Sequence, residues 1–465
     1  YYGTQAPARK LSLLNSTQYA TLRNESLVAD GKPILFPDPQ SLGTGTDWQN
    51  AIFNKDARIQ NHELSISGGN DKSTYYTSFG YFNQEGIISP SISNYKRYTL
   101  RFNSNHKVKS WLTFGNNLAY SYIRSQGGVT TNSEFGGQLS SAINLDPLTP
   151  IVITDPAIAA SNLYSLNPVY HDANGHPYAI SNYVTQEMTN PLAQMKTQVG
   201  NFGWSHNFVG NVFAEIEPIK GLKLRSSIGA KLAFYGGESF GQIYYLSANN
   251  SNKINNGFYR NSNNGLIWNW DNTATYTRVF GKHNLSALVG TGAQSNSSTG
   301  LSANYIGLPV TSINTASMNF PLPDANKIGG GWESQPYFLN SYFGRITYDY
   351  EGKYLFTGIL RVDGSSNFGS NNKYGKFPSA SFGWNPYMEN FWPKNDIVNT
   401  LKIRGSYGVN GNDNLPAFAY VSTIGGGRNY VLGNNLINIT KPDLITPTFN
   451  KLSIASVEGF NIMKK

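Results

Sequence analysis

The feature that most constrains this chain is a two-residue alternation of apolar and polar side chains that recurs along it. In residues 74–82, Tyr75, Phe79 and Tyr81 alternate with Ser78 and other small or polar residues. Successive side chains of a β-strand point to opposite faces, so such a segment forms a strand with one apolar and one polar face. The same alternation predicts strands in residues 98–103, 222–232, 354–363 and 401–410.

Alternation and turn residues together predict about a dozen strands. Their expected ranges are 61–67, 73–82, 95–104, 111–123, 201–216, 222–233, 265–279, 284–293, 340–350, 354–363, 377–385 and 399–409. The longer segments reach the roughly 9–11 residues that a tilted strand needs to cross a membrane. The expected fold class is therefore all-β and antiparallel.

The expected connections between these strands alternate in length. The short ones are 68–72, 105–110, 217–221, 280–283 and 351–353. The long ones are 83–94, 124–200, 234–264, 294–339 and 364–376. Short turns at one rim and long loops at the other are typical of outer-membrane barrels. A soluble β-sandwich explains the alternation within strands equally well, but it does not explain this asymmetry of the loops.

The composition agrees with a barrel and excludes several other classes. No apolar run reaches about 18 residues, which excludes a transmembrane helix. Charged residues make up only 14% of the chain and aromatic residues 14%, while the mean hydropathy is -0.38. A barrel with a polar lumen combines these values, because only one face of each strand meets lipid. With no cysteine, the chain has no disulfide and no thiolate metal site.

The charge and the chain start add two expectations. The net charge is +9, but lysine and arginine are dispersed, so we expect no nucleic-acid partner. Residues 16–27, with Asn15 and Ser16 as the capping residues at its start, form the one predicted helix. The chain starts without Met and without the charged and apolar regions of a signal peptide, which indicates a truncated or processed product.

Specific stretches resemble the SusC/RagA class of TonB-dependent outer-membrane transporters. In the first part of the chain these are 46–53 (TDWQNAIF), 60–69 (QNHELSISGG), 74–76 (TYY), 80–81 (GY), 84–86 (QEG) and 95–98 (YKRY). Later ones are 361–366 (RVDGSS), 368–369 (FG), 377–379 (FPS), 383–384 (GW) and 401–408 (LKIRGSYG). They keep the order of the family and extend over nearly the whole chain.

The resemblance implies that residues 1–465 are a partial β-barrel domain of the 22-strand type, without the plug domain and the C-terminal strands. It implies a place in the outer membrane, in contact with its lipid, and active import of oligosaccharides or peptides. Implied partners are a SusD-like surface lipoprotein and, through the missing plug, the TonB complex. Residues 385–387 (NPY) depart from a stretch that is usually hydrophilic and acidic, and the sequence beyond Thr440 matches no motif of the family.

No motif in the sequence indicates catalysis, so we expect no enzyme, no cofactor and no metal site. His171, Asp172 and His176 are compatible with a metal loop, but an Asn-Gly turn is the favoured interpretation. Residues 363–367 resemble a calcium loop without its spaced carboxylates, which favours a strand exit. The glycine-rich segments 43–45, 329–331 and 425–427 lack the lysine of a phosphate-binding loop and are predicted to be flexible loops.

Two sets of side chains remain as candidates for contacts with substrate, although the sequence does not identify the substrate-binding residues. Trp268 and Trp270 are expected in an interfacial girdle. The aromatic residues expected in long loops are Tyr164, Tyr170, Tyr178, Tyr183, Trp332 and Tyr337. Local packing is their favoured role, and stacking on sugar rings is the alternative. The cations expected in the lumen, where pairing with carboxylates is the favoured role, are Arg101, Lys223, Arg225, Lys231, Arg345, Arg361, Lys402 and Arg404.

Two alternative functions stay open at this point. A passive porin or an adhesive barrel shares the strand pattern but needs neither a plug nor energy input. A soluble, secreted carbohydrate-binding β-protein shares the alternation, and it differs in leaving the membrane without detergent.

Overall fold

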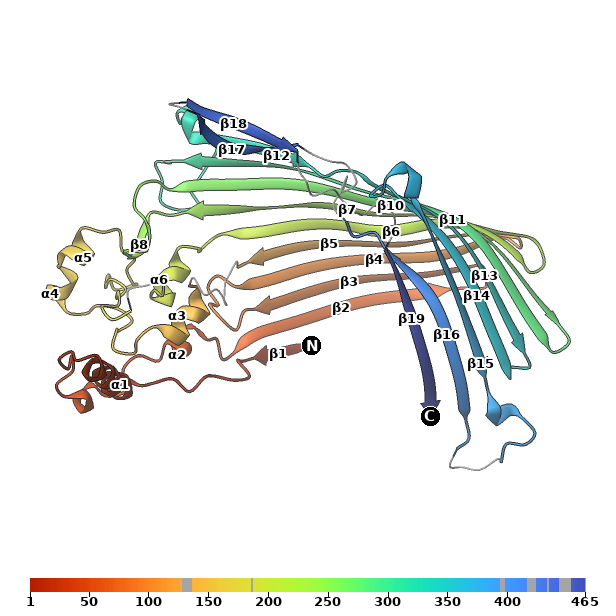
Figure 1. The fold of residues 1–465 in the computed structure, drawn as a ribbon, viewed down its shortest axis with the longest axis horizontal. Helices are drawn as coiled ribbons and strands as arrows, with labels where there is room; N and C mark the ends of the chain where they lie inside the picture. Colours follow the sequence, from red (N-terminus) through yellow and green to blue (C-terminus); the bar gives the residue numbers. More distant parts are fainter. Residues whose placement is uncertain are drawn as a thin grey trace.

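The computed structural model describes residues 1–127, 136–184, 187–393 and 398–415, together with the backbone of 424–432, 435–442 and 453–464. One long curved sheet of 15 strands dominates this part of the chain (Figure 1). Its neighbours follow the order β1-β2-β3-β4-β5-β6-β7-β10-β11-β13-β14-β15-β16-β19, and β12 pairs with β11 beside this path. The antiparallel prediction is confirmed, and the all-β prediction holds apart from short helices.

The first half of the sheet consists of β1 (Tyr2–Gln5), β2 (Ala57–Gly69), β3 (Ser73–Glu85), β4 (Asn94–Lys109), β5 (Leu112–Gln126), β6 (Phe202–Ile219) and β7 (Leu222–Gly241). The second half consists of β10 (Gly257–Phe280), β11 (His283–Ile306), β12 (Lys327–Glu333), β13 (Tyr337–Tyr350), β14 (Tyr354–Ser365), β15 (Tyr374–Trp384), β16 (Leu401–Asn412) and β19 (Ser453–Lys464). Two small hairpins stand apart, β8 (Tyr244–Ser247) with β9 (Asn250–Asn252) and β17 (Ile424–Leu432) with β18 (Asn435–Pro442).

Each of the predicted strands coincides with an observed strand, but several continue far into the expected long loops. β7 extends to Gly241, β10 begins at Gly257 and β11 ends at Ile306. The expectation of loops throughout 234–264 and 294–339 was therefore wrong in part. These extensions are rich in glycine, serine and asparagine, so no apolar alternation marks them, and backbone pairing between the strands forms them instead.

β12 and β13 run along the same side of β11 and form one strand path with a bulge. Glu333 of β12 pairs with Thr299 of β11, and Tyr337 of β13 pairs with Asn296, so one extra residue lies between the two strands. Residues 329–331 belong to β12 and residues 425–427 to β17, which corrects the prediction that these glycine-rich segments are flexible loops.

The two faces of the sheet differ as the alternation predicts. On the face that we call the apolar face, Leu64, Phe79, Leu100, Tyr120 and Phe208 are direct neighbours on five consecutive strands. Most of these rings and aliphatic chains are exposed, Leu64 at 67% and Leu100 at 51%. The opposite face, called the polar face below, carries mainly Asn, Ser, Thr, Gly and charged residues. A large exposed apolar surface of this kind needs a non-aqueous neighbour.

Rows of aromatic side chains cross the apolar face near both of its ends. One row, on β2 to β6, consists of His62, Tyr81, Tyr98, Tyr122 and His206. The other, around the turns at the opposite end, includes Phe280, His283, Tyr350, Tyr354 and Trp384. Amphipathic rings in such rows are typical of the two water interfaces of a membrane barrel. Trp268 and Trp270 also lie on the apolar face.

Short helices gather mainly at the end of the sheet that carries the long links, called the long-loop end below. They are α1 (Ser16–Ala29), η1 (Pro39–Leu42), α2 (Trp48–Ile52), α3 (Gln138–Asn144), α4 (Pro156–Ala159), α5 (Asn162–Ser165) and α6 (Pro191–Lys196), while η2 (Asp324–Asn326), η3 (Ser370–Asn372) and η4 (Pro386–Met388) are single turns. The predicted helix is α1, which Asn15 caps together with Gln18 in a capping box. None of the described helices has the length and apolar character needed to span a membrane.

Four apolar clusters are buried at the long-loop end of the described chain, and one of them consists of Phe368 and Phe377. Trp48 and Ile52 of α2 are buried against Ala142 and Leu145. A second cluster centres on Tyr178, Ala193 and Leu246, and a third on Phe240, Phe258 and Leu308. These clusters hold segments that are far apart in the sequence.

Candidate functional site: the polar face and the two ends of the sheet

A row of carboxamide side chains crosses the polar face. Asn103, Asn117 and Asn211 are paired neighbours on β4, β5 and β6. The row continues over Gly229 on β7 to Asn269 on β10 and Gln294 on β11. We call these five amide side chains the carboxamide row; Nδ2 of Asn117 donates to Oδ1 of Asn211 at 2.9 Å.

A first arginine on the polar face is Arg225 of β7. Its guanidinium lies 3.7 Å from the ring centroid of Phe213 and 3.8 Å from the Glu215 carboxylate. Lys223 donates to the same carboxylate at 2.9 Å. The Phe213 ring lies over Gly115, where any Cβ would come within 2.3 Å of it. The favoured role of Lys223 and Arg225, pairing with a carboxylate of a neighbouring strand, is what the geometry shows.

The second arginine explains the RVDGSS stretch. Nε of Arg361 donates to Asp363 at 2.7 and 2.9 Å, and its other nitrogen donates to Ser341 at 2.8 Å. The guanidinium also lies 5.5 Å from the ring centroid of Phe343. Gly364 has the Tyr374 ring across it, 2.4 Å from the place of a Cβ, so a larger residue does not fit there. The segment continues β14 as far as Ser365, in agreement with the predicted strand exit.

The remaining polar-face cations differ from these two. Within the described residues, Arg101, Lys231, Arg345, Lys402 and Arg404 are exposed and have no carboxylate within ion-pair distance. Lys402 and Arg404 lie beside a row of hydroxyl side chains that runs from Thr347 through Thr357 and Ser381 to Ser406. Positive charge on this face therefore remains available for groups outside the described residues.

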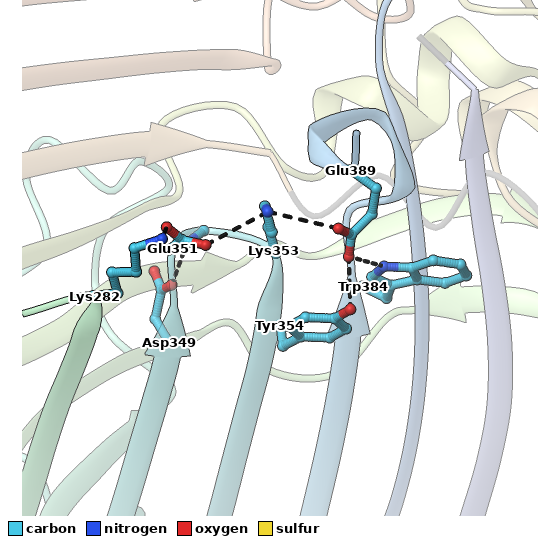
Figure 2. Close-up of polar contacts among 8 residues, drawn as sticks. Lys282, Asp349, Glu351, Lys353, Tyr354, Trp384 and Glu389 are labelled. Atoms are coloured by element: carbon cyan, nitrogen blue, oxygen red, sulfur yellow. Dashed lines mark hydrogen bonds and ion pairs between the residues drawn. The ribbon is translucent and has the colours of Figure 1, made fainter. Parts of the chain in front are cut away.

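At the opposite end, called the short-turn rim below, charges are closely paired (Figure 2). Lys282, in the turn between β10 and β11, forms an ion pair with Glu351 in the turn between β13 and β14. Lys353 lies 3.4 Å from Glu351 and 3.6 Å from Glu389. Glu351 has a φ of 53° and precedes Gly352, with a φ of 71°, as a tight turn with two left-handed residues requires.

Glu389 attaches the link after β15 to this rim (Figure 2). Its Oε1 accepts hydrogen bonds from the Tyr354 hydroxyl at 2.6 Å and from the Trp384 indole at 3.3 Å. The hydrogen bond from Tyr354 lowers the pKa of Glu389, and the hydrogen bond from Lys282 lowers the pKa of Glu351. The unusual NPY segment forms η4, the turn that brings Glu389 back to the rim.

The predicted loop aromatics have different environments. Tyr164 and Tyr178 are buried, and the Tyr170 hydroxyl donates to Gln242 at 2.8 Å; burial raises the pKa of Tyr170. Tyr183 is partly exposed beside Phe36. The other two belong to strands, with Trp332 exposed on β12 and Tyr337 of β13 donating to Asp413 at 2.7 Å.

The His171–His176 segment forms the favoured turn. Asp172 accepts backbone hydrogen bonds from Asn174 at 2.9 Å and His176 at 2.8 Å, and Gly175 has a φ of 84°. Among the described residues, no three His, Cys, Asp or Glu side chains lie close enough to share a metal ion.

Two important residues were missed from the sequence. Asp146 is 1% exposed; its carboxylate accepts from Thr149 and Ser181, and its carbonyl accepts from the Trp48 indole at 2.9 Å. Glu389 is the other. Neither residue belongs to a recognisable sequence motif. The aromatic residues that contact them, Trp48 for Asp146 and Tyr354 for Glu389, are the nearest clue to their roles.

Comparisons with known proteins agree with this architecture. No protein-family model matches the chain. It is similar to TonB-dependent receptor P3 of Formosa agariphila, with 29% identity over 90% of this chain and 38% of that protein. It is also similar to TonB-dependent receptor SusC of Bacteroides thetaiotaomicron, with 28% identity over 82% of this chain and 37% of the relative. The chain thus spans less than half the length of these relatives.

Solved structures show the same fold. The structure of the RagAB peptide transporter matches with a TM-score of 0.76 at 20% identity, over 99% of this chain and 51% of the matched chain. TonB-dependent receptors are outer-membrane β-barrels and not enzymes, which agrees with the predicted outer-membrane location and with the prediction that the chain is not an enzyme. Together these comparisons show that the chain is similar to SusC/RagA-type TonB-dependent receptors and spans between 37% and 51% of the length of these matched proteins.

Proposed function

We propose that this chain forms part of the wall of an outer-membrane transporter that imports oligosaccharides or peptides with energy supplied through TonB. The observation that carries the proposal is the two-faced sheet. Its apolar face, crossed by aromatic rows, suits lipid, and its polar face has cations that form no ion pair among the described residues and can meet a passing solute. The similarity to SusC and to a RagAB peptide transporter supports import as the function.

In this proposal residues 1–465 belong to the barrel domain, and sequence outside this chain supplies the plug and the remaining strands. A SusD-like lipoprotein is the proposed partner at the long-loop end. There, apolar clusters around Trp48, Tyr178 and Phe240 fix the loops into a folded surface on which such a partner can dock.

Uptake by cells that express the complete gene tests this function. We expect labelled oligosaccharides or peptides to accumulate only when TonB is present, and deletion of the gene for the proposed SusD-like lipoprotein to reduce uptake. Uptake that is unchanged without TonB would instead establish the passive porin alternative. If the protein leaves the membrane fraction without detergent, both barrel functions are wrong.

A further inference from the structure

The carboxamide row retains unused hydrogen-bonding capacity. Asn117 donates to Asn211, and Asn269 donates to Asp271 at 2.6 Å. In the part of the chain that the structure describes, the amides of Asn103 and Gln294 have no hydrogen-bond partner. A carboxamide offers two N–H donors and a carbonyl acceptor, so the row as a whole presents donors and acceptors without charge.

Two cations flank the row on the side of the long-loop end. Arg101 of β4 and Lys231 of β7 lie in the adjacent register row, with Ala119 and Val209 between them. Three strand spacings separate them, which is about 14 Å. Among the described residues neither has a carboxylate within ion-pair distance, in contrast to Lys223 with Glu215.

The two rows together form a polar strip with a positive charge at each of two fixed places. We propose that this strip contacts an acidic oligosaccharide in transit, with the carboxamides on its hydroxyl groups and Arg101 and Lys231 on carboxylate or sulfate groups. The inference rests on the proposed import function and specifies its substrate class.

An oligosaccharide fits this strip better than a peptide does. A sugar hydroxyl is both donor and acceptor, which matches a row of amides that offer both. Extended peptides are commonly bound through main-chain hydrogen bonds at a strand edge. In this strip the backbone groups of β4 to β7 are already paired with each other, so only side chains face the lumen.

The test replaces both cations in the complete receptor, as Arg101→Gln with Lys231→Gln, and measures uptake of tetragalacturonate and of neutral maltotetraose. We expect the KM for tetragalacturonate to rise at least about tenfold, since charge-assisted hydrogen bonds are lost, and the KM for maltotetraose to stay the same. The matched control is Lys96→Gln, which removes an exposed lysine from the other face of β4 and should change neither value.

A second variant addresses the carboxamides. Asn117→Leu with Asn211→Leu should raise the KM for tetragalacturonate without changing the heat-dependent gel mobility that reports a folded barrel. An unchanged KM in a folded variant would remove the row from the binding strip.

Other outcomes separate the rival explanations. If the cation variant admits large antibiotics and loses no preference for tetragalacturonate, the cations hold the plug and the inference is wrong. If the KM for an acidic tetrapeptide rises instead, the substrate class is wrong. Uptake of maltotetraose but not of tetragalacturonate by the unmodified receptor overturns this inference alone, whereas uptake that is independent of TonB overturns the proposed function.

Discussion

The two ends of the sheet are held by different forces. At the long-loop end, rings and aliphatic chains are buried around Trp48, Phe240 and Phe258, and the buried carboxylate of Asp146 is bound by hydroxyl groups. At the short-turn rim, tight turns are joined at the surface by ion pairs of Lys282 and Lys353 with Glu351 and Glu389. The first end depends on apolar burial and the second on charge.

This difference fits the role proposed for the long-loop end. Buried clusters hold long segments in one shape, as a docking surface for a partner requires. Ion pairs at the surface contribute little stability individually, but they fix the relative positions of neighbouring turns. Changes at one end should therefore leave the other unaffected, which the following predictions test.

The largest expected effect is that of Trp48→Ala at the long-loop end. Removal of this buried indole leaves a cavity and an unpaired Asp146 carbonyl, and should cost about 3–5 kcal/mol. Amide hydrogen exchange should become faster in α2 and α3, and the exchange rate in the turns near Lys282 should not change. The control is Trp111→Ala, which removes a half-exposed ring beside the β4–β5 turn and should cost less than about 0.5–1 kcal/mol.

The next largest effect is expected from a charge introduced on the apolar face, between the two ends of the sheet. Phe102 lies on the apolar face, so Phe102→Arg should reduce the free energy of folding into lipid vesicles by about 2–4 kcal/mol near the midplane. The adjacent Asn103 lies on the polar face, and Asn103→Arg should fold normally. Equal losses in the two variants would contradict the assignment of the faces.

A smaller effect is expected at the cap of α1. The Asn15 side chain accepts the Gln18 N–H at 2.8 Å, so Asn15→Ala should cost about 1 kcal/mol of local stability. Amide exchange within α1 reports the loss. Ser26→Ala on the exposed side of the same helix serves as the comparison and should not accelerate exchange.

The smallest effect should depend on pH and be confined to the short-turn rim. The pKa values of Glu351 and Glu389 are lowered in the folded chain. The two carboxylates therefore stabilise the fold above the unfolded pKa of about 4.3, and this stabilisation is lost as the pH falls through their pKa values in the folded chain. Exchange in residues 385–393 should accelerate in acid. Glu389→Gln should accelerate exchange in residues 385–393 already at neutral pH, whereas Glu25→Gln on α1 should leave it unchanged.

The strands and the faces were predictable because alternation is written into local sequence. Phe102 and Asn103, for example, were assigned to the correct faces without any tertiary information. The extensions of β10 and β11 were not predictable, because Asn and Ser residues there carry no apolar period. The partnership of Trp48 with Asp146 joins positions 98 residues apart, and only the folded chain brings them together.

The unpaired wall cations were also named from sequence, but their difference from Lys223 and Arg225 was not. Which lysine meets a carboxylate depends on the register between strands, as in Glu215 opposite Arg225. Register is fixed by turns and side-chain packing over several strands, so residue type alone does not show it.

Because of the extra residue between β12 and β13, even-numbered side chains lie on the apolar face in β13 but on the polar face in β12. Even-numbered residues of β13, such as Tyr342, belong to the apolar face, while in β12 the even-numbered Trp332 pairs with Gly300 and turns toward the lumen. Its ring lies over that glycine, where no larger residue fits. Deleting Gln335 should remove the bulge and turn this indole to the apolar face, so one inserted residue keeps Trp332 on the polar face near the long-loop end.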